Sequence, residues 1–233
     1  MIGVLALGAD SILGSPIYDM PAAMSGTRSV GQGLINGGGN GYDDLMLTWS
    51  IAEEANHTFD YSYVISGFLS PLLSHAIIEL STDCITIAGA KCVTNANVGT
   101  LAAAAPAAFE LGDWCYGASG IPGVNCQGNS NVGLPKDIVG IEFTNLPGST
   151  TVIITFNTAR GPAWGDVYLK GGQQYVYNQG NGKHAIDSNP LDFIARPDPA
   201  GTDPIPETPE PGSFGLAGAG LALLGALVRR RAK

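Results

Sequence analysis

Charge is what this sequence of 233 residues has little of: 13% of its residues are charged, where soluble domains typically have ~25%. Lysine and arginine are the scarcer group, with 11 against 20 aspartates and glutamates. Four of these 11 lie in the last five positions, so residues 1–228 hold 7 basic and 20 acidic side chains, a formal charge of −13. Such a body offers no basic groove for a phosphate backbone, and nucleic acid is not expected as a partner.

Recognisable catalytic motifs are also missing. There is no Gly-x-Ser-x-Gly nucleophile elbow, and His57, His75 and His184 are scattered without a metal-ligand spacing. The adjacent Glu53 and Glu54 would point to opposite faces of a strand, so they cannot form a glycosidase carboxylate pair by themselves. We therefore predict no enzymatic activity, no metal and no cofactor. His75, at the head of an apolar run, is interpreted as a hydrogen-bonded edge residue.

Turn-forming residues are abundant, with 33 glycines and 15 prolines, which favours short strands over long helices. Eight short runs have β-strand character, and they are not spaced as βαβ units. We therefore predict an all-β fold, an antiparallel β-sandwich of the jelly-roll type made of two packed sheets. The eight runs are 45–51, 59–66, 75–81, 137–144, 150–157, 166–170, 174–178 and 192–196.

In run 59–66 the apolar residues alternate, which predicts a half-buried strand. Two further segments have a less regular pattern. The alanine-rich segment 101–111 is the one candidate helix, and Pro106 interrupts it. Segment 31–41 has too many glycines for a dinucleotide-binding fingerprint and is predicted as a flexible loop. Asp43 and Asp44 follow it; they are interpreted as solvated acids, with a calcium-binding role as the alternative.

Four cysteines, Cys84, Cys92, Cys115 and Cys126, indicate an oxidising compartment because their number is even. We favour the local pairs Cys84–Cys92 and Cys115–Cys126, since each pair brackets a turn-rich segment. Buried free thiols remain an alternative. A zinc site is a weaker one, because no Cys-x2-Cys knuckle is present.

Aromatic residues supply the candidate ligand-binding site. Exposed tryptophan and tyrosine rings can stack on sugars, and most of the aromatic residues here fit a core. Trp114, with Tyr116 two residues later, lies in an expected loop and is the candidate exposed site. This raises the hypothesis of a carbohydrate-binding module.

The C-terminal part has the features of a membrane segment. Residues 214–228 read FGLAGAGLALLGALV without a charge, and Arg229, Arg230 and Arg231 follow directly. A membrane-spanning helix needs about 20 residues, with a lower bound near 17, so the span is short. The arginines would stay cytoplasmic, which places the preceding chain outside the inner membrane. A buried core helix is the alternative interpretation.

The segments at either side of the body complete the expected organisation. Residues 197–208 are rich in proline and predict an extended linker. Residues 1–14 contain an apolar stretch but no basic residue, and we interpret them as the remnant of a signal peptide whose true start lies upstream. The body is then 15–196 and the tail 209–233.

Pro209, Glu210 and Pro211, the apolar span and the arginine cluster occur in the order of a known signal. The segment 209–233 resembles the PEP-CTERM sorting signal of exported bacterial proteins. This resemblance implies that an exosortase recognises Pro209–Pro211 and removes the tail. It also implies a precursor anchored in the inner membrane and a product at the cell surface or in the extracellular matrix of a Gram-negative-type bacterium.

The body carries a second resemblance, in the pieces FDYSYVISG, SHAIIELS, DIVGIEF, GPAWGDVYLKGG and FIARPD. It looks like the β-rich body of a group of exported PEP-CTERM proteins, which implies an architecture but no activity and no site. The leading hypothesis is a structural or adhesive protein without catalysis. The alternatives are a carbohydrate-binding module retained in exopolysaccharide and, third, an extracellular hydrolase.

Overall fold

The computed structural model describes residues 22–81, 84, 92–115, 126–127, 131–183 and 188–197, with 126–127 described by the backbone alone. The protein is all-β, as predicted, and each of the eight expected runs contains a strand. Their bounds are β3 (Met46–Glu53), β4 (Phe59–Ser66), β5 (His75–Glu79), β10 (Ile138–Thr144), β11 (Val152–Thr158), β13 (Val167–Gly171), β14 (Gln174–Asn178) and β15 (Ile194–Pro197).

Seven further strands were not predicted from the sequence. They are β1 (Ser25–Val30), β2 (Gly33–Asn36), β6 (Thr94–Gly99), β7 (Ala104–Pro106), β8 (Phe109–Trp114), β9 (Cys126–Gln127) and β12 (Pro162–Gly165). Two short 3-10 turns, η1 (Asn40–Tyr42) and η3 (Pro190–Asp192), lie between strands.

The helix expected over 101–111 is wrong, because this segment forms β7 and the start of β8. Alanine favours helices locally, but here Ala104–Pro106 pairs with β6 at the end of the strand order. A proline is tolerated there because an edge strand leaves the missing N–H on the unpaired side. Tertiary pairing therefore overrides the helix propensity of the segment.

The glycine-rich segment 31–41 is not simply a loop, since it contains β2 and η1. Gly33 has a φ of +89°, a conformation that side chains rarely adopt, and a Cβ there would come within 2.3 Å of the Leu191 carbonyl oxygen. At this position, glycine allows two backbone segments to approach each other closely.

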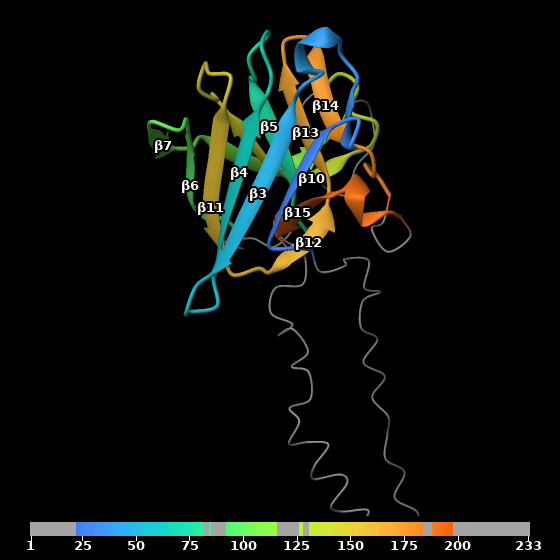
Figure 1. Ribbon diagram of the computed structural model, residues 1–233. Coiled ribbons are helices and arrows are strands. Elements are labelled where there is room, and N and C mark those ends of the chain that lie inside the picture. The colour runs from blue at the N-terminus through green and yellow to red at the C-terminus, as the bar shows by residue number, and fades with distance from the viewer. Residues whose placement is uncertain are drawn as a thin grey trace, which may run out of the picture. The chain divides into compact units, whose positions relative to one another are not determined.

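Thirteen strands form one sheet in the order β7-β6-β11-β4-β3-β1-β2-β14-β13-β5-β10-β8-β9, and β12 pairs with β15 separately. Neighbours are antiparallel except for β1 with β2 and β8 with β9. The prediction of two packed sheets therefore needs correction: one sheet curls so that its two halves face each other (Figure 1). Phe143 of β10 and Phe156 of β11 stack with ring centroids 6.0 Å apart although their strands are distant in the order.

The core lies between the two halves of the sheet. In β4 the expected alternation is confirmed, with Phe59, Tyr61, Tyr63 and Ile65 buried and the residues between them partly exposed. Each fully buried side chain of this size contributes about 1.5–3 kcal/mol through apolar burial. This core fixes the strands that carry the surfaces described below.

The small sheet β12–β15 packs against the core through the tyrosines of β4. The Tyr63 hydroxyl donates to the Ala195 carbonyl at 2.8 Å, and the Tyr61 hydroxyl lies 3.4 Å from the Arg196 carbonyl of the same strand and 3.1 Å from the Arg160 carbonyl, just before β12. Phenol groups are satisfied there while their rings remain in the apolar interior.

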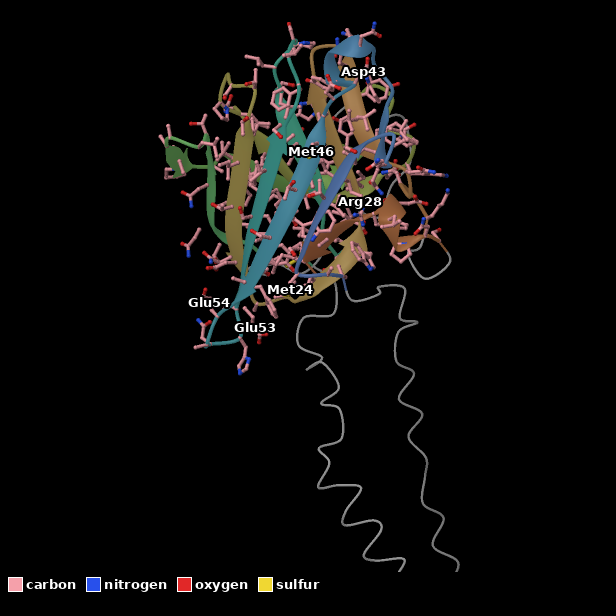
Figure 2. The ribbon with its side chains drawn as sticks, in the orientation of Figure 1. Met24, Arg28, Asp43, Met46, Glu53 and Glu54 are labelled. Carbon is pink, nitrogen blue, oxygen red and sulfur yellow. A yellow bond between two sulfur atoms is a disulfide. The ribbon has the colours of Figure 1, made fainter. Side chains whose placement is uncertain are left out.

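Arg28 of β1, labelled in Figure 2, connects the large sheet to the small sheet β12–β15. It is 7% exposed, and its guanidinium lies 4.9 Å from the Trp49 ring centroid and 5.4 Å from that of Trp164. It also donates to the carbonyls of Phe193 at 2.8 Å and Pro190 at 3.0 Å. A planar, five-donor group is suited to this combination of stacking and hydrogen bonding.

The Cys84–Cys92 disulfide is present, as predicted for the local pair. Cys115 is disulfide-bonded as well, and the described part of the chain has no free cysteine. The side chain of Cys126 lies outside the described residues, so the second predicted pair stays a prediction.

Within the described ranges, no helix combines the length and apolar character that crossing a membrane requires. The predicted span 214–228 lies outside those ranges, as do the signal-peptide remnant 1–14, the tail 209–233 and all of the linker 197–208 except Pro197.

Candidate functional site

The tryptophan predicted as an exposed sugar-binding residue is buried. Trp114 is the last residue of β8, is 3% exposed, and donates from Nε1 to the Gly140 carbonyl at 3.2 Å. It packs in a small apolar cluster with Ile77, Ile138 and Tyr168. The predicted role of Trp114 is therefore wrong, because a side chain enclosed on this strand stabilises the fold and has no face for a ligand.

Other predicted site residues lie outside the described residues and remain predictions. They are Tyr116, Pro209, Glu210, Pro211, Arg229, Arg230 and Arg231.

His75 is hydrogen-bonded as predicted, but it is not an edge residue. Its strand β5 lies between β13 and β10, and the residue is 8% exposed. Nε2 lies 3.1 Å from the Asn131 side-chain oxygen, and Nδ1 lies 3.1 Å from the Ser74 hydroxyl. The sequence shows an apolar strand with a polar first residue, and it contains no sign of which strands flank it.

Glu142 of β10 lies beside His75, with its Oε1 3.8 Å from Nε2 of the histidine. Burial, with a smaller effect of Lys170, lowers the pKa of His75 to about 4. Burial raises the pKa of Glu142 to about 7, and Glu110, its partner across the β10–β8 ladder, adds to the shift. Both groups are thus displaced toward their uncharged forms.

The acidic residues considered in the sequence analysis do not lie close together in the structure. Figure 2 shows Asp43 at one end of β3 and Glu53 and Glu54 at the other. Asp43 accepts a hydrogen bond at 2.8 Å from the Asn36 amide, which supports the glycine-rich turn, while the exposed Glu53 lies 3.2 Å from His57. Among the described residues, no three His, Cys, Asp or Glu side chains are grouped as metal ligands would be.

A hollow of about 380 Å³ opens on the outer face of the sheet over β3, β4, β11 and β6. Its central row crosses the strands in register: Ser50 is paired with Ser62, Ser62 with Thr155, and Thr155 with Asn97. Side chains directly opposite each other on neighbouring strands are about 4.5–5.5 Å apart at Cβ. The row therefore presents hydroxyl and amide groups at regular intervals.

One end of the hollow is more strongly polar. There Asn157 donates from its amide to the Asp60 carboxylate, and Asn97 donates to the Asn95 carbonyl at 2.8 Å. Asn95 has a φ of +50°, and the β11–β6 register shifts between Thr155 and Asn157. Such irregularities redirect side chains next to binding sites. We call these seven polar residues the outer groove: Ser50, Asp60, Ser62, Asn95, Asn97, Thr155 and Asn157.

A second hollow, of about 260 Å³, lies between segment 105–108 and segment 144–147. Small apolar side chains and prolines form most of its lining. Its described lining has no ionisable side chain and so supplies no acid or base for catalysis.

The residues of the outer groove were not identified from the sequence. A signal existed, because the outward positions of runs 59–66 and 150–157 are rich in Ser, Thr, Asn and Asp. What was missing is the order of the strands, which places β4 beside β11 and β11 beside β6.

Residues 207–231 match the family model of the PEP-CTERM protein-sorting motif. The chain carries a PEP-CTERM sorting motif. This motif is the recognition signal for exosortase processing, and it implies export of the protein as a membrane-anchored precursor and its transfer to the cell surface. The matched residues include Pro209, Glu210, Pro211 and the arginines 229–231. Searches of curated proteins and of solved structures found no match to the chain.

Proposed function

We propose that the body of this PEP-CTERM protein is a structural or adhesive domain without catalytic activity, released into the extracellular matrix when an exosortase removes the tail. In this proposal segment 214–228 anchors the precursor in the inner membrane and 197–208 is an extended linker. The matrix polysaccharide is the surface to which the released body adheres.

The observation that supports an adhesive role is the composition of the outer groove. Its described lining holds one carboxylate, Asp60, among neutral hydroxyl and amide groups. Acid–base chemistry on a glycoside needs two carboxyl groups across one bond, whereas hydrogen bonding to a polymer needs only donors and acceptors. The groove is therefore suited to holding a ligand rather than to breaking it.

A hydrolase remains the second candidate because of one specific observation. Glu110 and Glu142 are cross-strand neighbours, and the pKa of Glu142 is raised to about 7. Two carboxyl groups with separated pKa values are typical of acid–base pairs. Against this role, neither of the two hollows described above is lined by Glu110 or Glu142.

The test is the distribution of the full-length protein in a bacterium that has an exosortase, with an epitope inserted in the exposed turn at Gln173. We expect a shortened protein in the matrix that resists a low-salt wash and is released when the matrix polysaccharide is digested. Release by the wash alone would contradict the adhesive role. Loss of glycan-hydrolysing activity from the purified protein on Glu142→Gln would instead favour the hydrolase.

A further inference from the structure

We infer that the outer groove binds a neutral polysaccharide chain. This inference rests on the proposed adhesive function and adds to it the place of binding and the class of ligand. The outer groove takes the place of Trp114 as the candidate sugar-binding site, because the side chain of Trp114 is enclosed.

The groups in the groove match the hydrogen-bonding chemistry of sugar hydroxyls. A sugar hydroxyl both donates and accepts, and the serine and threonine hydroxyls and the asparagine amides of the groove do the same. The Asp60 carboxylate adds a strong acceptor at the end where Asn157 contacts it.

The arrangement of these groups fits an extended ligand. Ser50, Ser62, Thr155 and Asn97 follow one another on four adjacent strands. Each step along this row is about 4.5–5.5 Å, which is comparable with the length of one sugar ring. A polymer lying across the strands would meet a polar group at each ring.

The floor of the groove is rigid. Beneath the row, the rings of Tyr61 and Phe156 stack at 5.3 Å between centroids, and the Tyr61 hydroxyl is held by the Arg160 carbonyl. A preorganised surface loses little conformational entropy when it binds, which partly offsets the small number of contacts.

Charge selects a neutral polymer over an acidic one. The described lining of the groove contains no lysine or arginine, and residues 1–228 carry a formal charge of −13. Uronate, sulfate and phosphate groups would therefore be repelled.

The position of the groove disfavours an extended peptide. Peptides usually add to a free sheet edge, where the backbone supplies the hydrogen bonds. The strands β3, β4, β11 and β6 each have a neighbour on both sides, so the groove offers side chains only.

The experiment compares the purified full-length wild type with two groove variants, by affinity electrophoresis through gels containing dextran, laminarin, galactomannan or alginate. The variants are the pair Asn95→Gly with Asn97→Ala, and Ser62→Leu. Glycine keeps the positive φ of residue 95 while removing its amide, and Ser62→Leu removes a hydroxyl and fills part of the hollow without adding an aromatic ring that could stack on a sugar. The matched control is Gln173→Ala, which deletes an exposed amide in the turn between β13 and β14.

We expect retardation of the wild type and of Gln173→Ala by at least one neutral polymer. Binding should weaken about tenfold or more in Asn95→Gly/Asn97→Ala, as for the loss of two hydrogen bonds, and should also weaken in the Ser62 variant, whose larger side chain occupies the groove. Thermal unfolding of each variant checks that its fold is kept. Equal retardation of wild type and Asn95→Gly/Asn97→Ala would overturn the groove while leaving the adhesive function in place. Retardation by alginate alone would overturn the neutral specificity. Matrix retention of a protein that no neutral polymer retards would overturn this inference but not the proposed function.

Discussion

His75 and Glu142 lie 3.8 Å apart on neighbouring strands, yet they do not form an ion pair at neutral pH. An ion pair would raise the pKa of the histidine and lower that of the carboxyl group. The opposite holds here, with His75 lowered to about 4 and Glu142 raised to about 7. Burial of both groups outweighs their mutual attraction, and neutral His75 is held by Asn131 and Ser74 instead.

These two shifts predict opposing pH dependences of stability. Between pH 4 and 6.5 unfolded His75 binds the proton that folded His75 does not, so its contribution to stability rises with pH. Between pH 4.5 and 7 folded Glu142 retains a proton that the unfolded chain has lost, so its contribution falls with pH.

The two slopes largely cancel in the wild type, and single substitutions should reveal each one. Relative to wild type, Glu142→Gln should gain stability as pH rises from 4.5 to 7, and His75→Gln should lose stability as pH rises from 4 to 6.5. Urea unfolding at half-unit pH steps measures both. Difference profiles with the same sign for the two variants would show that the pair is not coupled to folding in this way.

Because Trp114 is buried, its replacement should lower the stability of the fold and should not act through ligand binding. Trp114→Ala leaves a cavity in the apolar cluster that it forms with Ile77, Ile138 and Tyr168 and should cost about 3–5 kcal/mol of unfolding free energy. Leu101→Ala, at a side chain that is 82% exposed, is the control and should change stability by less than about 0.5 kcal/mol. Denaturant unfolding compares the two. Equal stabilities would contradict the burial of Trp114.

The Cys84–Cys92 disulfide closes a short loop with a sequence separation of 8. Replacing both cysteines by alanine should lower the unfolding free energy by about 2–3 kcal/mol, because the unfolded chain gains conformational entropy. The comparison is made by thermal unfolding without reductant. In reductant the stability difference between wild type and variant should shrink, because the wild type then loses the same bond. A difference that persists in reductant would show that the two alanines, and not the missing bond, cause the loss.

Arg28 should not tolerate lysine although the charge is kept. Arg28→Lys loses the donor pair to Phe193 and Pro190 and the planar contact with Trp49 and Trp164. We expect a loss of about 2–3 kcal/mol, as for hydrogen bonds to a charged group. Ser25→Ala, on the exposed face of the same strand, is the matched control for chemical unfolding. A lysine variant as stable as this control would contradict the role assigned to Arg28.

The sorting motif predicts the fate of the precursor. Replacing Pro209, Glu210 and Pro211 by alanine should leave the tail attached and the protein in the membrane fraction, because the exosortase recognition signal is lost. Immunoblots of membrane and matrix fractions give the length and location of the product. A control with Pro204 and Pro206 replaced keeps the motif and should be processed normally. Normal processing of the first variant would place recognition elsewhere in the tail.

Eight of the fifteen described strands were predicted from the sequence, because alternating burial is a local property. The pattern in 59–66 predicted the buried face of β4 correctly. The strands that were missed, such as β2 within the glycine segment and β7 within the alanine segment, lack apolar alternation and exist through strand pairing, β2 with the distant β14 and β7 with the preceding β6. Their hydrogen bonds, rather than their own composition, fix their conformation.

The sequence by itself determined the features that are read within one continuous segment: the PEP-CTERM motif, the local Cys84–Cys92 pair and the all-β class. Only the tertiary structure decided which strands are neighbours. That order buries Trp114 among Ile77, Ile138 and Tyr168, places His75 in the middle of the sheet beside Glu142, and brings Ser62, Thr155 and Asn97 into one row. The physical reason is that strand pairing and curling depend on contacts far apart in the chain, and the polar positions of one strand do not specify their partners.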